Sequence, residues 1–168
     1  MKAMVLERVE GGSELMLADM PEPAVGPRQV AVAVRAASVN RADLDQRAGN
    51  YMPGRVPQVV RAGLDAAGQV VAVGEGVKTV AVGQRVMAMA PGGLAERVVV
   101  DETMVVPLPE DWSEAEGAAA IVALMTAHNA LVTAARLRKG ESVLVHGATS
   151  GVGLQTVRLS SWVCCTIR

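Results

Sequence analysis

The sequence lacks phenylalanine altogether and has one tyrosine and two tryptophans among its 168 residues. Apolar residues nevertheless make up 51% of the chain, and they are mainly alanine, valine, methionine and leucine. The chain is long enough for one domain, or for one domain and part of another, because domains typically have roughly 100–200 residues. Its core must therefore be packed from aliphatic side chains.

Cysteine and clustered positive charge are also scarce. The two cysteines, Cys164 and Cys165, are adjacent and near the end of the sequence, which fits neither a disulfide framework nor a Cys-x-x-Cys metal site. The net charge is -1 and the lysines and arginines are scattered, so the basic stripe typical of nucleic-acid-binding proteins is absent. We expect no nucleic-acid partner.

Long apolar runs are missing as well. The first twelve residues, "MKAMVLERVEGG", lack the apolar stretch of roughly 7–15 residues that a signal peptide needs. No uninterrupted apolar run reaches the roughly 18 residues that span a bilayer. We therefore expect a soluble, cytoplasmic protein with no membrane partner.

The first two thirds of the sequence are typical of a β-rich domain, because short apolar runs are bounded by glycine and proline. One interruption, residues 40–48, is rich in helix formers, and Gly49 follows it as a plausible C-terminal cap. The apolar runs predict strands over residues 2–6, 29–38, 66–74, 84–89, 95–101 and 104–108.

The pattern changes after "PLPEDW", where Ser113 and Glu116 have the spacing of a helical capping box. The apolar stretch that follows predicts a long helical segment, and a break near Met125–Thr126 stays open. We expect this segment to end at Lys139–Gly140, because a cation followed by glycine is typical of a helix C-terminus.

A uniformly apolar run at residues 142–146 predicts a short parallel strand buried on both faces. A glycine-rich turn follows it, and a helix is expected from about Val152. The unpaired amides at the start of such a helix can bind a pyrophosphate. Gly147 would permit the tight turn, Gly151 the close approach of backbone to phosphate, and Gly153 the packing of helix on strand.

The glycine spacing is G-x-x-x-G-x-G rather than the commoner G-x-G-x-x-G, and a turn rich in glycine for packing alone remains the alternative. An acidic residue that binds the adenosine ribose is expected about 20 residues after such a turn. No acidic residue follows Glu141.

Five stretches, in this order along the chain, carry a resemblance to a known family. The sequence resembles the zinc-independent quinone oxidoreductases, the zeta-crystallin-like branch of the medium-chain dehydrogenase/reductases. The resemblance implies a mixed α/β fold: a GroES-like β-barrel domain at residues 1–123, followed by the first part of a doubly wound Rossmann domain at residues 124–168. The stretches are "SVNRADLDQRAGNY", "GLDAAGQVVAVGEGV", "VGQRVMAM", "LMTAHNAL" and "VLVHGATSGVGLQTV".

The resemblance implies an NADPH-dependent oxidoreductase that transfers hydride to a quinone or a related enone or carbonyl; NADH stays open as the cofactor. It places Asn40 and Tyr51 beside the nicotinamide and the substrate, where an amide and a phenol can donate hydrogen bonds to a developing oxyanion. The cofactor-binding positions that it implies are Thr126, Gly147, Ser150, Gly151, Val152 and Gly153.

Several of these positions have structural alternatives. Asn40 precedes a helix and is a good N-cap, and Tyr51 can simply shield a loop. Asp43 and Asp45 are expected to be solvated surface charges, although several relatives carry an aromatic residue at the position of Asp45. Catalytic zinc is not expected, because "VNRAD" and "GLDAAG" contain neither cysteine nor histidine where the zinc enzymes of the superfamily have their ligands.

Family members continue beyond the point where this sequence ends, so the resemblance implies a chain truncated early in the Rossmann domain, with an atypical tail, "VRLSSWVCCTIR". The activity of this form stays open. The alternative is a catalytically silent GroES-like fragment that acts as an interaction module, or a non-functional truncated product. Exposed apolar strand edges predict association into homo-oligomers.

Overall fold

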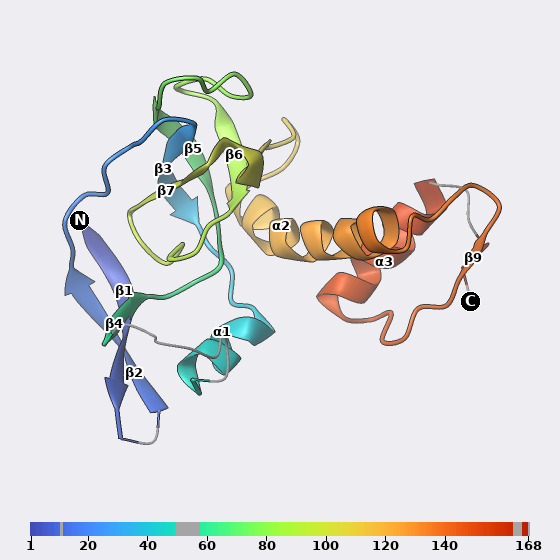
Figure 1. The fold of residues 1–168 in the computed structure, drawn as a ribbon, viewed down its shortest axis with the longest axis horizontal. Helices are drawn as coiled ribbons and strands as arrows, with labels where there is room; N and C mark the ends of the chain where they lie inside the picture. The colour runs from blue at the N-terminus through green and yellow to red at the C-terminus, as the bar shows by residue number, and fades with distance from the viewer. Residues whose placement is uncertain (11, 50–57, 163–165, 168) are drawn as a thin grey trace. The chain divides into compact units, whose positions relative to one another are not determined.

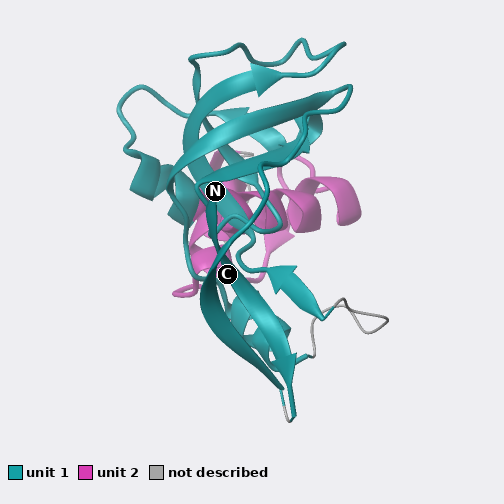
Figure 2. Ribbon diagram, turned by 90° about the vertical axis from the view of Figure 1, so that its left-hand side faces the viewer, with its two compact units in different colours: residues 1–119 teal, residues 120–168 magenta. Residues whose placement is uncertain are grey.

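The structure is a computed structural model that describes residues 1–10, 12–49, 58–162 and 166–167. The chain divides into two compact units, Met1–Ala119 and Ala120–Arg168, which Figure 2 shows in different colours. The assignment of a GroES-like domain to residues 1–123 and of a Rossmann portion to residues 124–168 stays a prediction.

Antiparallel sheets form the first unit (Figure 1). A three-stranded sheet has the order β2-β1-β4, and a five-stranded sheet has the order β7-β3-β5-β6-β8. The strands are β1 (Lys2–Val9), β2 (Gly12–Asp19), β3 (Gln29–Ala36), β4 (Val59–Arg61), β5 (Asp65–Val73), β6 (Arg85–Met89), β7 (Arg97–Asp101) and β8 (Val105–Pro107).

The core of the larger sheet is aliphatic, as the composition predicts. Val30 and Val32 of β3, Val70 of β5, Val86 of β6 and Val98 of β7 are at most 1% exposed. These β-branched side chains fit a pleated, buried surface. The predicted strands therefore agree with β1, β3 and β5 to β8 within a few residues at each end.

Sequence reasoning missed two strands, β2 and β4. The apolar residues of β2, Leu15 to Leu17, are consecutive, so they lack the alternation that marks a half-buried strand. Strand β2 forms because it pairs with β1 along its whole length, from Lys2 opposite Asp19 to Val9 opposite Gly12. A pairing partner elsewhere in the chain, and not local pattern, determines this strand.

The first helix, α1 (Arg41–Arg47), agrees with the predicted segment. Asn40 is its N-cap residue, and Gly49 has φ +75°, the left-handed conformation that favours glycine just past a helix end. The backbone N–H of Gly49 donates to the carbonyl of Gln46 at 3.1 Å. The predicted cap is therefore confirmed.

The second helix, α2 (Glu114–His128), begins at the predicted capping box. The backbone N–H of Ser113 donates to Glu116 Oε2 at 2.8 Å, and the backbone N–H of Glu116 donates to Ser113 Oγ at 3.3 Å. Each side chain thus satisfies a backbone N–H that the helix leaves free.

The end of this segment differs from the prediction. After α2 the chain continues as a π-helical stretch, η2 (Asn129–Ala134), so the irregularity follows His128 and not Met125–Thr126. The N–H of Leu137 donates to the carbonyl of Leu131 at 2.9 Å, and Arg136 has φ +52°, a left-handed closure that ends the helix before Lys139. Gly140 lies in a separate turn at residues 138–141, with φ +91°.

The strand predicted at residues 142–146 is also shorter. Only β9 (Ser142–Val143) is extended, and Leu144 is 67% exposed, so the expectation of burial on both faces is wrong. Strand β9 pairs in parallel with β10 (Thr166–Ile167), and α3 (Gly151–Trp162) connects them. A strand thus forms in the atypical tail, and α3 begins within one residue of the predicted start.

One helical stretch in the described part of the chain, Glu114–Ala134, is long and apolar enough to cross a membrane, with a mean hydropathy of 1.5. The sequence expectation counted only uninterrupted apolar runs and therefore missed it. This stretch is weak evidence for a membrane location, because core helices of soluble proteins meet the same criterion.

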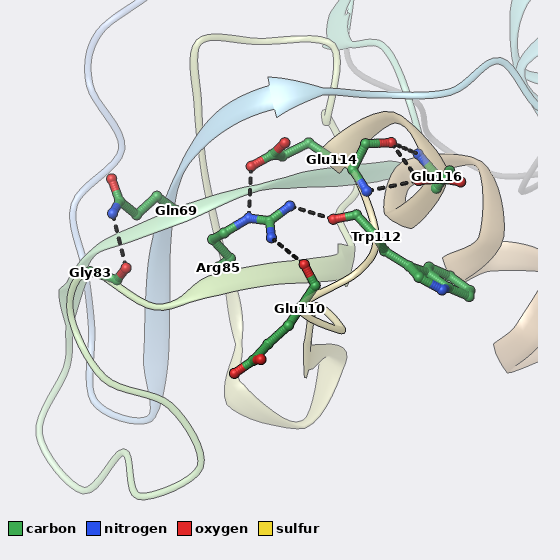
Figure 3. Close-up of polar contacts among 8 residues, drawn as sticks. Gln69, Gly83, Arg85, Glu110, Trp112, Glu114 and Glu116 are labelled. Carbon is green, nitrogen blue, oxygen red and sulfur yellow. Dashed lines mark hydrogen bonds and ion pairs between the residues drawn. The ribbon is translucent and has the colours of Figure 1, made fainter.

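Arg85 attaches the start of α2 to the larger sheet (Figure 3). Its Nε donates to Glu114 Oε1 at 3.0 Å, and its Nη2 donates to the carbonyl of Trp112. Its Nη1 lies 3.5 Å from the carbonyl of Glu110. The bond from Arg85 also holds the pKa of Glu114 below its ordinary value. One planar guanidinium thus fixes both the loop before α2 and its first turn.

We expect Arg85→Met to lower the free energy of unfolding by about 1–3 kcal/mol, because it removes charge-assisted hydrogen bonds to a carboxylate and to backbone carbonyls. Arg97→Met is the matched control, since Arg97 makes one exposed ion pair, with Glu22 at 2.8 Å. The control should change stability by less than about 0.5 kcal/mol. Urea unfolding of both variants measures their free energies of unfolding. Equal losses of stability in the two variants would show that the Arg85 contacts do not stabilise the attachment of α2 to the larger sheet.

Candidate functional site

A buried carboxylate lies at the start of β5. Asp65 is 0% exposed. It accepts hydrogen bonds from the backbone N–H of Ser38 at 2.6 Å, from Ser38 Oγ at 2.5 Å and from Asn40 Nδ2 at 2.7 Å. A buried charge requires such donors, because without them its desolvation would not be compensated. Asp65 therefore fixes the segment that leads into α1.

Asn40 takes part in two sets of contacts. Its Nδ2 donates to Asp65 and lies 3.2 Å from Ser38 Oγ. As the N-cap residue of α1 it also shares a capping box with Asp43, whose Oδ2 accepts from the backbone N–H of Asn40 at 2.6 Å. The structural alternative for Asn40, an N-cap, is therefore part of its role, and its place beside nicotinamide or substrate stays a prediction.

Asp43 is half-buried, and its Oδ1 is buried without a hydrogen-bond partner in the described part of the chain. Burial raises the pKa of this carboxyl above its ordinary value, and the nearby charge of Asp65 adds to the rise. The hydrogen bond from the Asn40 backbone opposes it. The expectation that Asp43 is a solvated surface charge is wrong, because its bond to the Asn40 backbone N–H holds the carboxyl in a half-buried position.

The other two predicted positions near the nicotinamide are less informative. Tyr51 lies outside the described residues. Thr126 is exposed on α2, and its Oγ1 donates to the carbonyl of Val122 at 2.7 Å, one turn earlier in the helix. Its hydroxyl proton is therefore engaged within the helix, although its oxygen can still accept a hydrogen bond.

The glycine-rich turn in the second unit is closed by its own backbone. Gly147 has φ +66°, and its carbonyl accepts from the backbone N–H of Ser150 at 3.0 Å. Ser150 precedes α3, and its Oγ accepts from the backbone N–H of Gly153 at 3.0 Å. The side chain of Ser150 is thus an N-cap, and its hydroxyl hydrogen remains available to donate to another acceptor.

Two glycines of this turn have different surroundings. A Cβ on Gly153 would lie 2.2 Å from the carbonyl oxygen of Gly147 and 2.8 Å from Cα of Ala148, so the fold requires glycine there. The sequence placed this packing against the strand, whereas the contact is with the turn itself. A Cβ on Gly151 would meet only Cβ of Ala123, at 3.9 Å, which is ordinary contact. The fold does not require glycine at position 151.

The open space beside Gly151 lies at the start of α3. Within the described residues, the backbone N–H groups of Gly151 and Val152 have no acceptor, as is usual for the first turn of a helix. Such amides, together with the positive end of the helix dipole, suit a phosphate oxygen. The residues present therefore fit the pyrophosphate of a dinucleotide.

No three His, Cys, Asp or Glu side chains gather as potential metal ligands in the part of the chain that the structure describes. Independence from zinc remains a prediction from the sequence. Ser38 and Asp65 are the residues that sequence reasoning missed. An aspartate at the start of an apolar strand, in "GLDAAGQVV", is the signal that could have identified Asp65.

The raised pKa of Asp43 predicts a pH-dependent stability. A carboxyl whose pKa is raised on folding stabilises the fold fully below its ordinary value of 3.8, and this stabilisation is lost as the pH rises through the raised pKa. We expect Asp43→Asn, which cannot ionise and keeps an oxygen for the Asn40 N–H, to gain stability relative to wild type over that interval. Thermal unfolding between about pH 3.5 and 8 measures it.

Asp45→Asn controls for the loss of one negative charge on the same helix. If the difference in melting temperature between wild type and Asp43→Asn stays constant with pH, Asp43 does not titrate as its surroundings indicate.

Comparison with known proteins places this geometry in a family. The model of the alcohol dehydrogenase GroES-like domain matches residues 26–110. The chain is 35% identical to the quinone oxidoreductase of Thermus thermophilus, a structure also determined with NADPH, with a TM-score of 0.79 over 99% of this chain and 52% of that one.

Two curated relatives are similar over most of this chain. The rat synaptic vesicle membrane protein VAT-1 homolog is 40% identical over 163 residues, 95% of this chain and 40% of the relative. The spectinabilin polyketide synthase system protein NorB of Streptomyces orinoci is 41% identical over 149 residues, 88% of this chain and 7% of the relative. The chain thus spans about half of the solved relative and less of the curated ones. It belongs to the alcohol dehydrogenase GroES-like domain family, and its structural neighbours are quinone oxidoreductases of the medium-chain dehydrogenase/reductase superfamily.

Proposed function

We propose that this chain contributes to a zinc-independent, NADPH-dependent oxidoreductase that transfers hydride to a quinone or to a related enone or carbonyl. The observation that carries the proposal is the open space at Gly151, beside two backbone N–H groups without an acceptor in the described residues. The fold has no need of glycine at this position, whereas a phosphate that approaches the backbone closely does need it.

The chain's own groups have separate tasks in this proposal. The N–H groups of Gly151 and Val152 bind phosphate oxygens, and the hydroxyl hydrogen of Ser150 is free to add a third donor. Asp65 and Ser38 hold Asn40 in one orientation. The bound nicotinamide supplies the hydride.

The comparisons support the cofactor and the reaction class. The similar quinone oxidoreductase of Thermus thermophilus has been determined in complex with NADPH, which favours NADPH over NADH. Structural similarity to the CurK enoyl reductase, which is 26% identical, favours activated alkenes within the range of acceptors.

A second candidate function, an interaction module, is favoured by the apolar surface of β2. This strand is at the edge of its sheet, where β1 is its one neighbour among the described strands. Leu15, Met16 and Leu17 are 48%, 40% and 60% exposed. An edge strand with apolar side chains can pair with another chain, and we propose a second copy as the partner.

The cofactor proposal predicts that two glycine substitutions separate folding from binding. Gly151→Ala should weaken NADPH binding at least about tenfold, because its methyl group occupies the phosphate space, and should change stability by less than about 1 kcal/mol. Gly153→Ala should lower the free energy of unfolding by about 1–3 kcal/mol, because it forces the turn apart.

Cofactor fluorescence measures the dissociation constant, and urea unfolding measures the stability. If Gly151→Ala binds NADPH as tightly as wild type, the phosphate is not bound at this turn. If the wild-type chain does not bind NADPH at all, the proposed function is wrong for this chain.

The second candidate predicts association through β2. We expect the apparent mass in sedimentation to rise with concentration, and Leu17→Lys to suppress this rise because it adds a charge to the edge strand. Val82→Lys is the matched control, since Val82 is 61% exposed and lies outside the strands. Equal effects of the two substitutions, or a wild type that stays monomeric, would rule out this interface.

A further inference from the structure

We propose that Asp43 and Gln46 share one proton on the buried side of α1, so that the protonated pair stabilises this helix and its ionisation loosens the helix as the pH rises. Asp43 Oδ1 carries the proton, and Gln46 Oε1 accepts the hydrogen bond. Both residues belong to the first unit, and their pairing is independent of the proposed function.

Two buried acceptors lie one turn apart on α1. Asp43 Oδ1 and Gln46 Oε1 are both buried, and neither oxygen has a hydrogen-bond partner in the described part of the chain. Both side chains are half-buried, and residues three positions apart on a helix are neighbours on one face. A buried acceptor that has no donor destabilises the fold. A single hydrogen between these two oxygens removes both defects.

The other contact of Asp43 decides which of its oxygens carries the proton. Asp43 Oδ2 accepts a hydrogen bond from the backbone N–H of Asn40 at 2.6 Å. Because Oδ2 is already an acceptor, a proton on the carboxyl group is placed on Oδ1. The protonated carboxyl then has a hydroxyl donor where the ionised form has a second acceptor. Gln46 Oε1, one turn later, is the acceptor for that donor.

The charges around Asp43 favour the protonated form. Burial raises the pKa of Asp43, and the negative charge of Asp65, the buried carboxylate of β5, adds to the rise. The cations of α1, Arg41 and Arg47, make no ion pair with Asp43 among the residues that the structure describes. Strand β2, which packs against α1, carries a further negative charge at Glu14. An ionised Asp43 therefore lacks a compensating cation.

The stabilisation of α1 has a defined pH dependence. It is fully present below the ordinary pKa of the Asp43 carboxyl, 3.8, and it is lost as the pH rises through the raised pKa. Above that pH, Oδ1 is a charged acceptor next to Gln46 Oε1, and neither oxygen has a donor in the described residues. The contact between Asp43 and Gln46 then becomes repulsive, and α1 opens more readily.

The first test measures the pKa of Asp43 in the full chain, by carbon NMR of its carboxyl group. We expect Gln46→Met, which keeps the length of the side chain but removes the amide oxygen, to lower the proton affinity of Asp43 at least about threefold. Gln69→Met is the matched control, because Gln69 donates to the carbonyl of Gly83 at 2.9 Å, in another part of the unit. It should leave the pKa of Asp43 unchanged.

The sign of this change separates two arrangements of the amide, whose oxygen and nitrogen have nearly the same shape. If the amide nitrogen of Gln46 instead donates to an ionised Asp43, Gln46→Met removes a donor from the carboxylate and raises its pKa. A raised or unchanged pKa of Asp43 in Gln46→Met would therefore overturn the shared proton.

The second test follows α1 itself by hydrogen exchange. The backbone N–H of Ala48 donates to the carbonyl of Leu44 at 3.0 Å, so its protection factor reports on opening of the helix. In wild type this protection should fall at least about threefold as the pH rises through the pKa of Asp43. Asp43→Asn supplies a permanent amide donor to Gln46 Oε1, so its protection should stay constant. The N–H of Val70, in the buried core, is the reference for global unfolding.

The exchange measurement decides the question even if Gln46→Met does not fold, because Asp43→Asn leaves Gln46 in place. Protection of Ala48 that stays constant with pH in wild type would overturn the proposal. The same holds if protection falls equally in wild type and in Asp43→Asn, since the loss would then not come from the proton of Asp43.

Discussion

The charge of Asp65 is the constraint on which the first unit depends. A carboxylate that is 0% exposed must be surrounded by donors, and the segment between β3 and α1 supplies them from Ser38 and Asn40. The same residue is crowded on its backbone, because a Cβ on Gly93 would lie 1.8 Å from its carbonyl oxygen. The side chain of Asp65 therefore holds the entry to α1, and its carbonyl lies against the loop after β6. Asn40 is bonded to Asp65 directly, and Asp43 is bonded to the backbone of Asn40.

A second constraint acts on the glycine-rich turn, where Gly151 and Gly153 have different structural requirements. Gly153 permits α3 to lie against Gly147 and Ala148, so it belongs to the fold. Gly151 has open space before it and an unpaired N–H within the described residues, so the fold does not require glycine there, whereas the proposed phosphate site does. Ser150 connects the two, because its oxygen caps the helix while its proton remains available. A motif read only as a spacing of glycines does not separate these roles.

The sequence pattern predicted those parts of the structure that depend on residues close together in the chain. The strands of the larger sheet, the capping box at Ser113 and the cap at Gly49 follow from side-chain type and backbone preference. Strand β2 was missed because its partner β1, and not its own alternation, creates it. The strand at residues 142–146 was predicted too long because only two of its residues have a partner, in β10. Part of the pKa rise of Asp43 and the side-chain contacts of Asn40 depend on Asp65, which is more than twenty residues away in the sequence.

The difference between Gly151 and Gly153 has an evolutionary consequence. A methyl group at position 153 damages the fold, so selection for a stable protein maintains glycine there in active and inactive chains alike. At position 151 a methyl group leaves the fold intact, so under the proposed function only selection for phosphate binding maintains glycine. A lineage that abandons the cofactor is thus free to drift at position 151 in a single substitution, with no compensating change elsewhere. In an alignment of relatives, the column of position 151 would then separate chains that still bind a dinucleotide from chains that keep only the fold.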